Sequence, residues 1–188
     1  MIKYFIIILT LLSFQISLLG YHNSTNAKTI QINLKSDTTF EYLLKQNNMM
    51  FDVPKGYKEV KPVPNGQMNY EKAYKHPSLK FEVRYAIRRT DFEYPKQIFE
   101  MTVLNISGGT LPSYTSFEAT AVKEEFGADG GATVMVEVGK EFGQDYKYCL
   151  FVYIHKKGIG DGYIFYLADD KETIGDLINP IFHALKFR

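Results

Sequence analysis

The chain has 188 residues, a length that predicts one domain, and its 45% hydrophobic and 23% charged residues are ordinary for a globular protein with a buried core. A formal net charge of +1 excludes the basic surface of a nucleic-acid-binding protein and any strong steering field. One cysteine excludes an internal disulfide, and 14 Tyr with 14 Phe favour a strand-rich fold.

The N-terminal segment has the pattern of a secretory signal. Lys3 precedes a nearly unbroken apolar run that is shorter than the roughly 20 residues of a spanning helix. Cleavage could fall after Gly20 or Ala27, and an uncleaved anchor is the alternative. We expect residues 1–27 to be a signal peptide and lead-in, and residues 28–188 to be one exported domain, periplasmic or extracellular, with no membrane span after cleavage.

The first half of this domain predicts short strands around one helix. Residues 29–34 alternate as a strand, and residues 37–47 suggest a helix capped by Asp37 or Thr38. A strand then ends at Pro54, and Pro64-Asn65-Gly66 has the chemistry of a tight hairpin turn. Residues 78–89 alternate as a long strand, with apolar residues on a core face and Glu82, Arg84 and Arg88 on a solvent face.

The second half predicts three strands between helices. Residues 92–106 have weak helical spacing, and a clearer helix follows a cap at Ser113, Thr115 or Ser116 and stops at Gly127. Strands are expected within 132–142, 145–155 and 162–169. A last helix begins at Asp169 or Asp170, kinks or stops at Pro180, and precedes a short strand at 184–187. This order predicts an α+β fold with a mostly antiparallel sheet flanked by helices.

The glycine-rich stretch KKGIGDGY (156–163) invites comparison with a phosphate-binding loop. Phosphate loops lead from a strand into a helix, whereas strand-like residues follow here and the third glycine is misplaced. Asp161-Gly162 is typical of a hairpin, so we predict a turn.

No catalytic or metal constellation is evident. The four histidines lack metal-ligand spacing, and Asp169, Asp170 and Glu172 suit a helix N-terminus. Cys149 is interpreted as a small buried hydrophobe, with a catalytic thiol as the alternative. On one strand it would lie roughly 20 Å from His155, at about 3.3 Å per residue, which excludes a direct pair. We therefore predict no cofactor and no bound metal.

The aromatic strands carry the candidate binding residues. Alternation gives the strands at 145–155 and 162–169 two apolar faces, so helices could cover both faces, or one face could form a groove for a ligand. The groove hypothesis assigns ligand contacts to Phe151, Tyr153, His155 and Tyr166. Lys156 and Lys157, at the rim, are candidate partner contacts.

The order of elements resembles the superfamily of PsbP, the extrinsic photosystem II protein, which includes the Ran-binding nuclear import factor. The resemblance rests on F-x-V-P-x-G-Y at Phe51–Tyr57, the long strand at 78–89, the strand triplet, and a final helix closing on A-L-K-F at Ala184–Phe187. Tyr57 stands where the family commonly has Trp, and Ala184-Leu185 replaces Ser-Phe. The resemblance implies an antiparallel sheet flanked by helices and a non-enzymatic binding or assembly role.

We therefore expect an exported, non-enzymatic module that binds a protein partner. A carrier of a small apolar ligand in an aromatic groove is one alternative. The other is a hydrolase whose site forms only in three dimensions.

Overall fold

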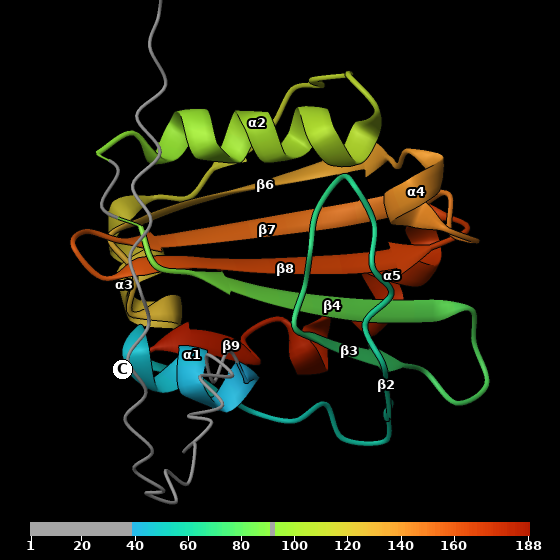
Figure 1. Ribbon diagram of the computed structural model, residues 1–188, viewed down its shortest axis with the longest axis horizontal. Helices are drawn as coiled ribbons and strands as arrows, with labels where there is room; N and C mark the ends of the chain where they lie inside the picture. Colours follow the sequence, from blue (N-terminus) through green and yellow to red (C-terminus); the bar gives the residue numbers. More distant parts are fainter. Residues whose placement is uncertain (1–38, 91–92) are drawn as a thin grey trace, which may run out of the picture. The chain divides into compact units, whose positions relative to one another are not determined.

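The computed structural model describes residues 39–90 and 93–188, all within the compact unit Ser36–Arg188 (Figure 1). The predicted signal peptide and the predicted strand at 29–34 lie outside these residues. The elements are, in chain order, α1 (Phe40–Gln46), β1 (Met49–Phe51), β2 (Lys58–Val60), β3 (Lys72–Lys75), β4 (Phe81–Arg88), α2 (Pro95–Ser107), β5 (Thr115–Ser116), α3 (Ala119–Phe126), β6 (Gly130–Glu137), α4 (Lys140–Gly143), β7 (Tyr148–Lys156), β8 (Gly160–Ala168), α5 (Lys171–Leu177), the 3₁₀ helix η1 (Asn179–Ile181) and β9 (Leu185–Phe187).

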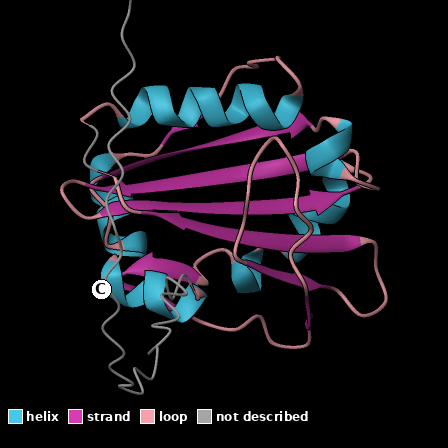
Figure 2. Ribbon diagram, in the orientation of Figure 1, coloured by secondary structure: helices cyan, strands magenta, loops and turns pink. Residues whose placement is uncertain are grey.

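A seven-stranded antiparallel sheet forms the centre of the fold, with strand order β2-β3-β4-β8-β7-β6-β5. Helices flank this sheet, as the colours of Figure 2 show, so the predicted α+β class is confirmed. The terminal strand β9 pairs with β1 in a separate two-stranded ribbon, a pairing between distant segments that local sequence patterns do not specify. Within the described residues, no helix is both long enough and apolar enough to cross a membrane.

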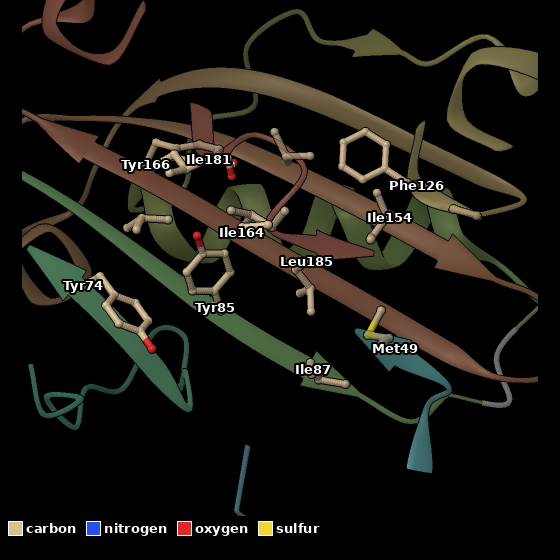
Figure 3. Packing of buried hydrophobic residues seen from close by; sticks show 14 of the residues in the cluster. Met49, Tyr74, Tyr85, Ile87, Phe126, Ile154, Ile164, Tyr166, Ile181 and Leu185 are labelled. Atoms are coloured by element: carbon tan, nitrogen blue, oxygen red, sulfur yellow. The ribbon is translucent and has the colours of Figure 1, made fainter. Parts of the chain in front are cut away.

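Both faces of the sheet are covered by protein. On one face, α2 packs along β6 and β7, and its buried Phe99, Val103 and Ile106 meet the aromatic side chains of β7 and β8. The opposite face is covered by α1, α3, α5 and the β1–β9 ribbon. Figure 3 shows this second core, where Met49 and Leu185 of the ribbon lie against strand residues such as Ile154 and Ile164. Of the two alternatives for the aromatic strands β7 and β8, the structure therefore shows the one in which both faces are covered.

Strand β4 differs from its prediction of one core face and one solvent face. Only Arg88 of its three polar residues is partly exposed, whereas Glu82 and Arg84 are buried. Arg84 Nε donates to Glu82 Oε1 at 2.6 Å, and Arg84 Nη1 donates to the carbonyl of Phe142. The solvent-face prediction was wrong because α4 and the loop before β3 cover this face, and the two opposite charges are buried as a pair.

The turn between β7 and β8 also lies elsewhere than predicted. Lys156 pairs with Gly160, so residues 157–159 form the turn, and Gly158 adopts the positive φ of 70° that the reversal requires. The hairpin is confirmed, but Asp161 and Gly162 are inside β8. The predicted location of the turn was wrong because Asp161 makes buried contacts, described below, that place this residue within β8.

The helices α1 and α3 begin at other cap residues than the sequence predicts, whereas the predicted end of α3 and the predicted cap of α5 are observed. Helix α1 is capped by Thr39, whereas Asp37 and Thr38 lie outside the described residues. Thr115 and Ser116 do not cap α3 because they form β5, and the N-cap position is Glu118. Gly127 ends α3 at φ 62° as predicted. Asp170 caps α5, and the predicted early stop near Pro180 takes the form of η1.

The Pro64-Asn65-Gly66 turn is not a two-residue hairpin. Strands β2 and β3 pair no further than Val60 with Ala73, so the turn lies within a long loop. The side-chain oxygen of Asn65 accepts hydrogen bonds from the backbone N–H groups of Gln67 and Met68 at 3.0 and 2.8 Å. Asn65 therefore forms a turn, as predicted, but this turn lies in the middle of the loop between β2 and β3.

Candidate functional site

The four predicted ligand residues do not lie on one surface. Phe151 and Tyr153 face the α2 side of the sheet, whereas Tyr166 faces the opposite core. Phe151 stacks on Phe99 of α2, with ring centroids 5.3 Å apart, and the Tyr166 hydroxyl donates to the carbonyl of Ile181 at 3.2 Å. All three aromatic side chains are buried in contacts with the protein itself.

The structure joins His155 and Tyr153 to a residue that was predicted only as part of a turn. Both side chains reach one oxygen of Asp161: the Tyr153 hydroxyl donates to Oδ1 at 2.7 Å, and His155 Nδ1 lies 2.7 Å from the same atom. His155 and Asp161 are directly opposite in the β7–β8 ladder, which explains the contact. Asp161 is completely buried, so this end of the hairpin contains a buried polar cluster.

Tyr163 also interacts with Asp161, and both Tyr153 and Tyr163 are held in the protonated form. Burial is the main cause that raises the pKa of both Tyr153 and Tyr163, and the negative charge of Asp161 raises both further. A neutral phenol can donate a hydrogen bond to an oxygen of Asp161, as Tyr153 does. Asp161 Oδ2 makes no standard hydrogen bond with the described residues, although Tyr163 interacts with the carboxylate. The cluster thus surrounds the buried Asp161 side chain with the side chains of Tyr153, His155 and Tyr163.

An Asp–His contact also orients the base in many hydrolases, but a nucleophile must then approach the histidine. Among the described residues, the His155 ring hydrogen-bonds only to Asp161. A hollow of about 170 Å³ is lined by Tyr153 and by residues of α2, β5 and β6, and His155 does not line it. Cys149 is fully buried, and burial raises the pKa of its thiol well above the usual range, so it is not a thiolate nucleophile. The geometry therefore supports a structural role for the Asp161 cluster.

The two lysines predicted as partner contacts lie at the rim of the β7–β8 hairpin. Lys156 Nζ donates to the carbonyl of Gly127 at 2.6 Å and lies over the Phe187 ring. The Lys157 backbone N–H donates to Asp129 at 3.0 Å, and its side chain is exposed. Lys156 thus ties the hairpin to the end of α3, and Lys157 remains accessible.

A surface that was not predicted lies along the outer side of α2. Tyr94 and Met101 are each 63% exposed, unusually high for large apolar side chains, and Ile98 lies between them. A shallow hollow of about 520 Å³ follows this side of the helix, and we call its lining residues the α2 stripe: Tyr94, Gln97, Ile98, Met101, Thr102 and Asn105. The sequence signal was present, because these apolar positions recur at helical spacing away from Phe99, Val103 and Ile106.

A larger open cleft of about 900 Å³ lies between residues 51–57 and 179–186. It is formed mainly by the β1–β2 turn and the segment leading into β9. Its lining mixes apolar groups with Asp52, Lys55 and Lys186, and no buried polar group defines a ligand there. The α2 stripe is more uniform in chemistry than this cleft.

The described residues contain no group of three His, Cys, Asp or Glu side chains that could hold a metal ion. No protein-family model, no curated protein and no solved structure matches the chain.

Proposed function

We propose that this protein is a non-enzymatic module that binds a protein partner through the α2 stripe. The observation that carries the proposal is the exposure of Tyr94 and Met101 on one side of a helix whose opposite side is firmly packed. Contiguous apolar surface of this kind marks interaction sites in soluble proteins, whereas isolated apolar residues do not.

The chemistry of the stripe suits a polypeptide. None of its six residues is charged, so a partner can cover it without burying an unpaired ion. Full burial of a large apolar side chain stabilises a complex by about 1.5–3 kcal/mol, so Tyr94 and Met101 can act as anchors. Gln97 and Asn105 provide hydrogen-bonding groups at its margin. An apolar centre with polar edges is the usual anatomy of a protein interface.

Export and PsbP-like ancestry belong to the same proposal. Export is supported by Lys3 and the apolar run that follows it. The family resemblance is supported by the turn after β1, by the three long adjacent strands β8, β7 and β6, and by α5 leading into the terminal strand β9. Both fit an envelope protein that functions by binding.

The proposal is tested by capture from envelope extracts with three immobilised proteins: wild type, Met101→Glu, and Leu79→Glu as the matched control. Leu79 is also an exposed apolar residue, 49% exposed, but it lies in the turn between β3 and β4. We expect a protein that wild type and Leu79→Glu retain and Met101→Glu loses. Failure to retain any protein, or retention that Met101→Glu does not alter, would contradict the proposal. Circular dichroism checks that both variants are folded.

A further inference from the structure

We propose that one partner of the α2 stripe is a second copy of this chain, with the two α2 helices packed antiparallel about a two-fold axis. This inference rests on the proposed docking surface and identifies what covers it. In such a pair each copy presents the same patch, so the patch must be complementary to itself. The α2 stripe meets this requirement in position, in charge and in helix polarity.

The positions are symmetric about a point midway between Ile98 and Met101. A two-fold axis through that point sets Ile98 against Met101 of the other copy, and Met101 against its Ile98. The apolar pair therefore forms the centre of the contact. The same axis sets Tyr94 opposite Asn105, so an exposed hydroxyl meets an amide able to bond it. Gln97 lies opposite Thr102, which is buried and whose hydroxyl donates to the carbonyl of Ile98 at 2.8 Å, so this position adds no hydrogen bond across the axis.

Charge does not oppose the pairing. The ionised residues of α2 lie off the stripe: Lys96 pairs with Glu100 at 3.8 Å, and Glu100 also accepts a hydrogen bond from Tyr114 at 2.7 Å. The antiparallel arrangement also places the positive N-terminal end of each helix beside the negative C-terminal end of the other. A parallel arrangement would bring like ends together.

The length of α2 limits the strength of the contact. It has 13 residues, about 20 Å at 1.5 Å per residue, and the stripe occupies one side of it. Such a helix pair buries less than the roughly 800 Å² per partner of a standard interface. We therefore expect a weak dimer, with a dissociation constant on the order of micromolar or above, that a heterologous partner using the same stripe would displace.

The arrangement is tested by thiol cross-linking of the full chain with Tyr94→Cys and Asn105→Cys variants. In the proposed dimer, position 94 faces position 105 of the other copy. Two copies of position 94 are separated by about 16 Å along the helix axis, at 1.5 Å per residue. Both residues are exposed, whereas the native Cys149 is buried and does not compete.

Under mild oxidation, a mixture of the two variants should form the mixed dimer at least five-fold faster than either variant links to itself. Adding Met101→Glu to both should abolish this preference, and Leu79→Glu should leave it unchanged. Sedimentation equilibrium of the full chain should show self-association that Met101→Glu weakens at least ten-fold.

Equal mixed and same-site linking, or a monomer up to millimolar concentration, would overturn the self-pairing. Association through any other segment would survive Met101→Glu and would count against it too. If self-pairing fails while extract capture still depends on Met101, the proposed function stands with a different partner. If capture is also insensitive to Met101→Glu, the stripe is not a docking surface.

Discussion

Replacing Arg84 by Met should destabilise the protein more than any ordinary surface change, because it leaves an acidic side chain buried. Arg84 is fully buried and Glu82 nearly so. The guanidinium also lies over the rings of Tyr70 and Phe142, with its carbon 4.8 and 5.0 Å from the two centroids. In Arg84→Met the Glu82 carboxylate would keep only Lys75, 3.3 Å away and half exposed, as a charged neighbour.

The expected magnitude follows from this loss of pairing. Removing one partner of a buried ion pair costs about 3–5 kcal/mol of unfolding free energy, whereas replacing both charges is often neutral. For a chain of this size, each kcal/mol corresponds to about 2–4 °C in melting temperature, so Arg84→Met should lower it by roughly 10 °C. The double variant Glu82→Gln/Arg84→Met removes both charges and keeps an acceptor for Tyr146, which interacts with Glu82. It should recover at least half of the loss.

Urea unfolding of the wild type, the single variant and the double variant, followed by far-UV circular dichroism, measures the free energies directly. A double variant more stable than Arg84→Met supports the charge argument. If the two variants are equally unstable, the packing of the Arg84 stem against the two aromatic rings is the cause, and the reasoning from an unpaired charge is refuted.

Three further predictions concern single positions. Cys149 should resist thiol reagents at pH 8 in the folded protein and react on unfolding, because burial raises its pKa; rapid native labelling would contradict this. Gly127→Ala should cost about 1–3 kcal/mol in urea unfolding, since φ is 62° and a Cβ would lie 2.8 Å from the Phe187 carbonyl oxygen, whereas Gly130→Ala meets no atom and should cost less. Asp170→Ala should destabilise at pH 7, and that difference should vanish in acid. Hydrogen bonds from the first turn of α5 lower the Asp170 pKa, so its contribution is present above about pH 4 and is lost as pH falls through the folded value; a pH-independent difference would contradict this.

Local signals predicted the elements whose cause is local. Alternating apolar residues located β4, and continuous apolar runs rich in Tyr and Phe located β7 and β8, because a strand between two covered faces needs β-forming side chains along its length. Gly127 and Pro180 marked helix ends for local reasons: glycine permits the positive φ that ends α3, and proline lacks the N–H group that a continuing helix needs. These signals also gave the α+β class.

Features that depend on distant contacts were not predictable in the same way. Asp161-Gly162 has ideal turn chemistry, yet Asp161 lies in a strand because Tyr153 and His155 bind its carboxylate. Glu82 and Arg84 were predicted to face solvent because the alternation of polar and apolar residues shows only which face of the strand is polar. It does not show that α4 and the loop before β3 cover that face. The exposed side of α2 was detectable in principle from the spacing of Tyr94, Ile98 and Met101, but only once its buried side was known.

The covered sheet also decides where binding can occur in this fold. Because helices and loops cover both faces, most of the Tyr and Phe side chains are used in packing, including Phe151, Tyr153 and Tyr166. A binding surface must then come from the outward side of a covering element. Two of the exposed large apolar residues, Met101 and Leu104, belong to α2, and a third, Tyr94, is its N-cap residue, while the others are distributed over separate segments. Apolar groups on one rigid helix keep their spacing, so a partner can contact them together without first ordering a loop.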